Sequence, residues 1–269
     1  MPTKEQYIRN QEIIMRRLAK AYVPKVYAAI QSQISAAIQA VKDKGIQGAQ
    51  GNIHGSIINT EIGPVIEELY LTAAKLAIRK YKPNKKAFGF NEEFINAVIA
   101  YFQKYLLEKV VLPISQTTID YVEKVLQQAL NEGWGVDKTI KQLEDTELPK
   151  WRARLIVRTE SARATNFTQM AAADEEDVEM EKQWIAIDDK RTRKSHSHAG
   201  VDGQRVDIDQ PFSNGLMFPG DPNGPAKEVC NCRCTMGYFA KRDANGNIIP
   251  KQPQPLNLIS RMNINQQAA

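Results

Sequence analysis

The sequence predicts an α+β protein with a largely helical N-terminal region, a small loop-rich α+β module and an extended C-terminal tail. From residue 5 to about residue 174, apolar residues recur every three or four positions, the period of an amphipathic helix. After that point, short apolar runs alternate with Gly, Pro, Asp and Asn, a pattern typical of short strands joined by turns. We therefore expect a helical region at 1–130, a module at 131–240 and an extended tail at 241–269.

The helical region opens with a first helix over residues 5–41. Pro24 should kink or divide it, because proline lacks the backbone N–H that an α-helix uses. Four glycines between residues 42 and 57 then predict a flexible connection. A second helix is expected to open near Thr60.

Four further helices complete the helical pattern. The third carries Phe94 and should end at Pro113, with Ser115 capping the next. A short helix ending at Leu143 follows a Gly-rich turn. The last should run over 149–174, with Pro149 in its first turn, and the module's strand-containing part is expected at 180–240.

Composition narrows the functional classes. Charged residues make up 25% and hydrophobic residues 42% of the chain, as in an ordinary globular protein. No run of 18 apolar residues exists, so no membrane partner is expected, and the polar N-terminus predicts no signal peptide. A net charge of +5 is compatible with nucleic acid contact but does not mark a dedicated binder.

The cysteines and histidines are concentrated near the C-terminal end. Cys230, Cys232 and Cys234 are the only cysteines, and His196 and His198 are two of three histidines. His198 and the three cysteines are therefore candidate zinc ligands. On a regular strand, side chains two apart are roughly 6.5–7 Å apart, whereas a zinc–sulfur bond is about 2.3 Å long, so the backbone would have to turn. The alternative is a free-thiol cluster packed like small apolar side chains, with His198 hydrogen-bonded to backbone or carboxylate.

A second alternative is catalysis by a nuclease or thiol-based hydrolase. Cys232 would be the nucleophile and His198 its base, with Asp202 or Asp207 orienting the base. Two further thiols within two residues of a nucleophile invite disulfide capture. We therefore expect no enzyme activity, no catalytic residue and no bound organic cofactor.

The last predicted helix carries a polar face. Thr159, Arg163 and Asn166 share one side of it, and Glu160 reaches Arg163 at a spacing of three. One interpretation is a solvated charged face. The other is a polar seam, containing Arg158, Glu160 and Arg163, where the helix meets the C-terminal module.

Two other segments stand out between residues 188 and 222. Arg191, Arg193 and Lys194 lie beside the two histidines and could contact DNA phosphates or a partner. They could equally pair with the acidic residues at 174–181. Residues 217–222 carry two prolines around a glycine, which predicts a rigid turn.

Several sequence motifs follow one another along the chain in a definite order. They are the Gly-rich turn at 133–135, the segment 154–163, Trp184 with Asp189 and 191–193, His198 five residues before Gly203, Phe212 with 219–222, and Asn231-Cys-Arg-Cys234. In this order they resemble the Mu F-like minor head proteins of tailed bacteriophages, the phage head morphogenesis family, over roughly residues 130–236. The chain departs from the family in its second histidine, His196, and in the additional Cys230.

The resemblance implies a minor virion component that acts at the portal vertex or inside the capsid, in head assembly and DNA packaging or delivery. Its expected partners are the portal protein, other capsid proteins and genomic dsDNA. Several copies per virion, made in the host cytoplasm, are expected.

Overall fold

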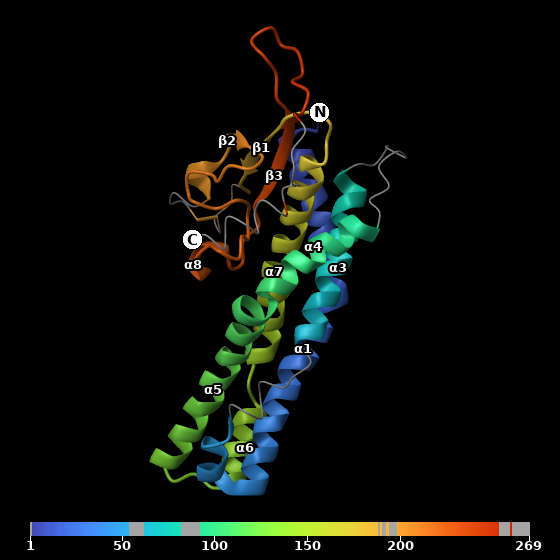
Figure 1. Cartoon of the computed structure of the whole chain (residues 1–269). Coiled ribbons are helices and arrows are strands. Elements are labelled where there is room, and N and C mark those ends of the chain that lie inside the picture. Colours follow the sequence, from blue (N-terminus) through green and yellow to red (C-terminus); the bar gives the residue numbers. More distant parts are fainter. Residues whose placement is uncertain are drawn as a thin grey trace. The chain divides into compact units, whose positions relative to one another are not determined.

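The computed structural model describes residues 2–53, 62–81, 92–187, 189, 192–193, 198–252 and 259. It confirms the α+β class: helices dominate the described part of 1–174, and a small antiparallel sheet follows (Figure 1). The chain divides into two compact units that each join distant segments. Unit 1 comprises Met1–Ala19, Leu69–Phe102 and Arg158–Ala269, and unit 2 comprises Lys20–Glu68 and Gln103–Val157.

Unit 2 is helical throughout its described regular elements. It holds most of α1 (Lys4–Gln50), the start of α3 (Ile62–Tyr81), the π-helix η1 (Leu106–Val111), α5 (Leu112–Asn131), α6 (Val136–Glu144) and the start of α7 (Leu148–Asp174). Apolar side chains of α1 such as Ile30 and of α5 such as Leu126 are fully buried. Within this core, Gln33 donates a hydrogen bond to the Ser115 hydroxyl across 3.1 Å.

Three expected helix boundaries were wrong. The glycines after residue 42 do not end α1, which continues to Gln50; two helical segments meet at Gly45, whose φ of 68° is non-helical. Pro24 lies inside α1, so of the two effects expected of it, a kink or a division, the division does not occur. Pro113 lies in the first turn of α5, where its missing N–H costs no hydrogen bond, so it begins a helix and ends none. Ser115 is consequently inside α5 and does not cap it. The predicted start at Thr60 lies outside the described residues.

Unit 1 contains the sheet. Its strands β1 (Met180–Ile185), β2 (Arg205–Asp207) and β3 (Thr235–Ala240) lie in the order β2-β1-β3, all antiparallel. In the register, Lys182 of β1 is opposite Val206 on one side and Tyr238 on the other. The short helices η2 (Ala199–Val201) and α8 (Ala226–Val229) lie in the connections, and α4 (Glu92–Tyr105) contributes most of its length to this unit.

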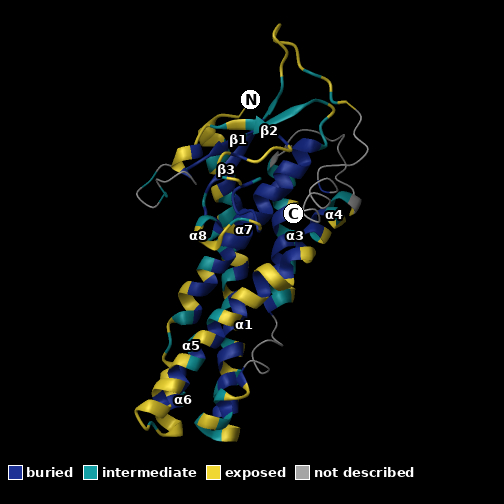
Figure 2. Cartoon of the chain, turned by 60° about the vertical axis from the view of Figure 1, so that its left-hand side comes forward, coloured by how far each residue is buried: buried dark blue, intermediate teal, exposed yellow. Residues whose placement is uncertain are grey.

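The C-terminal half of α7 is the central element of unit 1. Every residue from 159 to 174 is buried, polar and apolar alike, as the continuous dark blue of this helix shows (Figure 2). Phe167 stacks on Tyr101 of α4 with ring centroids 3.9 Å apart, and Phe218 lies 5.5 Å from Phe167. A helix buried on all sides must satisfy its polar groups inside the protein, and this requirement organises the site described below.

The described part of the tail pairs with the segment before β1. Val178 bridges Pro250, and Lys251 donates its backbone N–H to Asp177. Within the tail itself, Arg242 bridges Ile248. Residues 241–252 are therefore tied to the module. None of the helices in the described ranges combines the length and apolarity that a membrane span requires.

Candidate functional site

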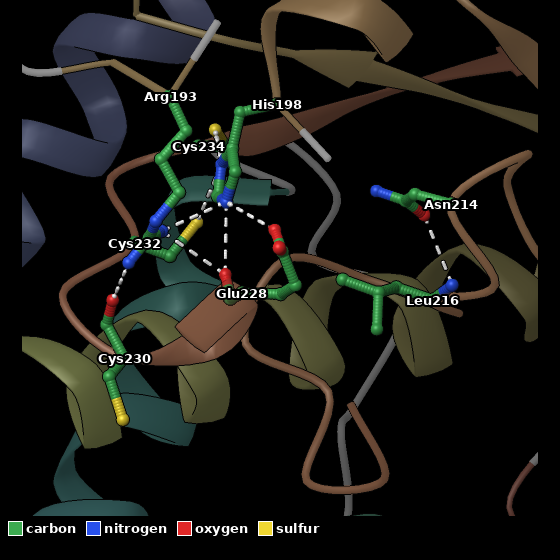
Figure 3. Close-up of polar contacts among 8 residues, drawn as sticks. All are labelled: Arg193, His198, Asn214, Leu216, Glu228, Cys230, Cys232 and Cys234. Atoms are coloured by element: carbon green, nitrogen blue, oxygen red, sulfur yellow. Dashed lines mark hydrogen bonds and ion pairs between the residues drawn. The ribbon is translucent and has the colours of Figure 1, made fainter. Parts of the chain in front are cut away.

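His198, Cys232 and Cys234 form one buried cluster in unit 1 (Figure 3). The His198 Nδ1 atom lies 3.1 Å from the Cys234 sulfur and 3.6 Å from the Cys232 sulfur. The exposed fractions of the three residues are only 2%, 2% and 3% in chain order. A cysteine–histidine cluster therefore exists, and it excludes solvent.

The backbone turn that such a cluster requires is present. Asn231 has a φ of 58°, a left-handed conformation that few non-glycine residues adopt. It separates Cys230, at the end of α8, from Cys232, so the thiols of Cys232 and Cys234 reach the histidine. The Cys230 sulfur is directed away from the cluster (Figure 3). Cys230 thus does not join the other three predicted ligands.

The second ring nitrogen of His198 is also held. Its Nε2 atom lies 2.9 Å from the backbone carbonyl oxygen of Glu228 and 2.9 Å from a guanidinium nitrogen of Arg193. If Nε2 carries the proton, it donates to Glu228 and leaves the Nδ1 lone pair directed at the sulfurs. If Nδ1 carries the proton, Nε2 accepts from Arg193 and Nδ1–H donates to a sulfur. Both tautomers fit the surrounding atoms.

The two thiols differ in acidity. A hydrogen bond from Cys234 lowers the pKa of Cys232 most strongly, and the positive charges of Arg193 and Arg233 lower it further. The same contact, together with burial, raises the pKa of Cys234 well above its ordinary value. The pair therefore favours one thiolate that accepts a hydrogen bond from the neighbouring thiol.

The geometry of the alternative, a catalytic site, is not assembled. Asp202 accepts a hydrogen bond from the backbone N–H of Ala186 (2.9 Å) and pairs with Lys4 (2.6 Å). Asp207 pairs with Lys241 at 2.9 Å. Neither carboxylate takes the position next to His198, which Glu228 and Arg193 fill. The arrangement suits metal binding or structural hydrogen bonding better than a nucleophile–base–acid triad.

Arg193, the described member of the predicted basic contact set, points into the protein. Its guanidinium donates to the backbone carbonyls of Glu228 (3.2 Å) and Cys230 (2.6 Å). It therefore holds the turn around the cluster. Arg191, Lys194 and His196 lie outside the described residues. The described acidic residues Asp174 and Glu179 pair with Lys251 and Lys241, each at 3.4 Å.

The predicted polar face of α7 lies against the turn that carries the cysteines. Arg158 donates to the Asn231 side-chain oxygen across 2.8 Å. The backbone N–H of Asn231 donates to the Thr159 hydroxyl, also across 2.8 Å. Two consecutive α7 residues thus fix Asn231 in its left-handed conformation.

One turn further along α7, a buried ion pair meets the segment 217–222. Arg163 donates to Glu160 at 2.7 Å and, from Nε, to the backbone carbonyl of Gly220 at 2.8 Å. Tyr70 of α3 donates its hydroxyl to the same Glu160 carboxylate at 2.5 Å. Burial and the Glu160 charge together raise the pKa of Tyr70 well above its ordinary value. Tyr70 falls in an apolar stripe of the sequence, and no signal there marks its hydroxyl.

Asn166 completes this seam. Its side-chain amide donates to the backbone carbonyls of Pro219 (3.1 Å) and Cys234 (3.2 Å), linking the 217–222 turn to the start of β3. The turn is itself stabilised by Asp221, whose carboxylate accepts from the backbone N–H groups of Met217 and Asn223. The sequence predicts this turn but not its position against α7.

Comparison with known proteins finds a match to a protein family. Residues 120–237 match the family described as Phage Mu protein F like protein. These residues include the α7 seam, the 217–222 turn and the whole His198–Cys234 cluster.

Three relatives are similar over part of their length. A minor head protein of Bacillus phage SPP1 is 31% identical over 45% of this chain and 40% of its own. An NAD(+)–arginine ADP-ribosyltransferase of Enterococcus faecalis is 36% identical over 34% of this chain and 20% of its own. The Bacillus subtilis protein YqbB is 27% identical over 44% of this chain and 41% of its own. The chain thus spans less than half of each relative, and no solved structure matches it.

Proposed function

Because residues 120–237 match the family described as Phage Mu protein F like protein, we propose that this protein is a minor head protein of a tailed bacteriophage. The observation that carries the proposal is the similarity to the SPP1 minor head protein, together with the match to the family over residues 120–237. A structural role also agrees with the site: the family-matched residues form a seam and a sealed cluster that hold segments together.

An enzymatic function has less support. A thiol nucleophile must meet its substrate, and the thiols of Cys232 and Cys234 are almost completely buried. The relative named as an ADP-ribosyltransferase matches this chain over only 20% of its length, which leaves most of that protein without a counterpart in the match. We therefore propose no catalytic activity.

The finer proposal places the protein at the portal vertex or inside the capsid, with the portal protein and other capsid proteins as partners. Its role there would be head assembly and DNA packaging or delivery. Mass spectrometry of purified particles of the phage that encodes the chain tests the first step. We expect the protein in mature heads in several copies, and its absence from both mature heads and assembly intermediates would overturn the proposal.

The position within the head needs a separate measurement. Cross-linking mass spectrometry on intact heads should yield links to the portal protein, and a phage lacking the gene should form heads with less DNA or lower infectivity. Links to tail proteins alone, with normal heads from the deletion phage, would contradict the portal assignment.

Contact with dsDNA can be tested on the purified chain. If Arg191 and Lys194 neutralise two phosphates, replacing both by Ala should weaken binding and reduce the slope of log K against log salt by about 2. Arg193→Ala is the comparison variant, since its guanidinium is bonded inside the module. An unchanged salt slope in the double variant would exclude these two side chains as phosphate contacts.

A further inference from the structure

We propose that His198, Cys232 and Cys234 bind one zinc ion, and that Cys230 is not a ligand. The first observation is the spacing of the ligand atoms. Around a tetrahedral zinc ion with bonds of about 2.0–2.3 Å, a nitrogen and a sulfur lie about 3.5 Å apart. The Nδ1 atom of His198 lies 3.1 and 3.6 Å from the two sulfurs, and all three ligand atoms are within 4.8 Å of one another.

The second observation is the environment of the other ring nitrogen. A histidine that binds a metal usually donates its remaining N–H to a carbonyl or carboxylate, which fixes the tautomer and the ring orientation. Nε2 of His198 lies 2.9 Å from the Glu228 backbone oxygen, and a carboxylate oxygen of the same residue is 4.0 Å away. In the tautomer that donates from Nε2 to Glu228, Nδ1 is free to bind an ion between the two sulfurs.

The third observation is the way in which the backbone selects two thiols out of three. The left-handed Asn231 turns the chain between Cys230 and Cys232, and Arg158 and Thr159 of α7 hold that residue in place. Cys230 instead offers its carbonyl oxygen to Arg193, and its thiol points away (Figure 3). Among the residues that the structure describes, no fourth histidine, cysteine or carboxylate ligand joins these three.

The donor set indicates which metal is bound. Thiolates are soft ligands that select zinc over hard cations such as calcium or magnesium, and imidazole also suits zinc. The ion would join residue 198 to the start of β3, in a module whose connections are mostly loops. Zinc would therefore act as a structural link in this module.

Metal analysis of the full-length chain, expressed with added zinc, tests the proposal. We expect about one zinc per chain and, after exchange for cobalt, absorption bands of thiolate-bound Co²⁺. Zinc removal by a chelator should lower the melting temperature, and added zinc should restore it. A wild-type protein that carries no zinc and gives no thiolate–cobalt bands would overturn the proposal.

The cysteines provide a matched set of variants. Cys232→Ser and Cys234→Ser should each lose most of the bound zinc, whereas Cys230→Ser should keep the wild-type amount. If the first two variants fail to fold, Cys230→Ser and the wild type still decide the matter: both must show the same cobalt spectrum. Loss of zinc or a changed spectrum in Cys230→Ser would show that the assigned ligand set is wrong.

Discussion

The backbone of Gly220 lies directly against Arg163 of helix α7. The Arg163 Nε atom donates to the Gly220 carbonyl at 2.8 Å, and a Cβ atom built on Gly220 would lie 3.0 Å from the Arg163 Cα atom. Gly220 also has a φ of +92°, where side chains are strained. The close approach of these two residues sets the distance between α7 and the 217–222 turn.

Gly220→Ala should therefore destabilise the protein strongly. The new methyl group would meet the backbone of α7, which cannot yield as a flexible side chain can, and the left-handed conformation adds strain. We expect a loss of about 2–4 kcal/mol in the free energy of unfolding, measured by urea titration.

Gly215 is the matched control for this substitution. It has a φ of +79°, but a Cβ atom there would meet nothing within 4 Å. Gly215→Ala should show the backbone strain alone, about 1 kcal/mol. Equal losses of unfolding free energy in Gly220→Ala and Gly215→Ala would mean that the contact with α7 does not contribute to stability.

The buried pair of Arg163 and Glu160 leads to a second prediction. Their side chains are only 5% and 6% exposed, so Arg163→Ala would leave the Glu160 carboxylate buried with only the Tyr70 hydroxyl among these partners. We expect Arg163→Ala to lose about 3–5 kcal/mol of the free energy of unfolding and to have a lower melting temperature. Calorimetry of the purified variant would measure both changes.

An exposed ion pair at the N-terminal end of the same helix, between Lys150 and the residue before the helix, gives the comparison. Lys150 and Glu147 are also three residues apart and lie 2.7 Å from each other, but both are largely exposed. Solvent screens such a pair, so Lys150→Ala should leave the melting temperature almost unchanged. If Arg163→Ala proved equally mild, α7 would have to be solvated around Arg163 in solution.

The fold could be predicted wherever local pattern decides it. The helical period and the later change to short apolar runs placed the helices and the sheet region correctly. Two boundaries failed: α1 continues beyond residue 41 with only a local break at Gly45, and Pro113 lies in the first turn of α5, where a proline is tolerated. The π-helical turn at Leu106–Val111 has no simple sequence pattern that would reveal it.

For the site, the sequence supplied the residue types but not their partners. The polar side of α7 was visible in the spacing of Thr159, Arg163 and Asn166. Arg163 and Asn166 donate to backbone carbonyls, and Thr159 accepts from a backbone N–H. The sequence does not show which backbone groups will face these side chains. The orientation of Cys230 away from Cys232 likewise depends on one φ angle at Asn231, which only the folded turn determines.

Asn166 leads to a third prediction. Its amide donates to the carbonyls of Pro219 and Cys234, so Asn166→Asp would replace the donor by a carboxylate facing two acceptors. We expect a loss of about 2–4 kcal/mol at neutral pH.

The pH dependence of Asn166→Asp distinguishes this mechanism from a simple packing defect. Burial against two carbonyls should raise the pKa of the new carboxyl in the folded state. The new carboxyl then binds a proton more tightly in the folded state than in the unfolded chain. The difference in the free energy of unfolding between Asn166→Asp and the wild type should therefore become smaller as the pH falls. A deficit that is constant with pH would contradict this explanation.

Lys182 of β1 leads to the last prediction, because it is fully buried and no carboxylate of the described residues forms an ion pair with it. Its Nζ atom lies 3.6 Å from the Met170 sulfur and 5.3 Å from the centre of the Phe212 ring. Burial lowers the pKa of Lys182 to about 7, and the more distant charges of Asp221 and Asp209 oppose this shift only in part. The strand pattern around Trp184 predicted β1 but gave no indication that this lysine lies inside.

Replacing Lys182 by Met should therefore stabilise the protein, and more so at low pH. Below the folded pKa of about 7, the amine is protonated in both states and the full cost of burying its charge is present. Between that pH and the unfolded pKa near 10.4, only the unfolded chain keeps the proton, so the wild type regains stability as the pH rises. We expect Lys182→Met to raise the free energy of unfolding by roughly 2–4 kcal/mol near pH 6 and by much less above about pH 9. Urea titration at each pH would measure this change. Lys141→Met, at an exposed position of α6, should leave the wild-type pH profile unchanged. A gain for Lys182→Met that does not depend on pH would show that the amine is not buried as a charge.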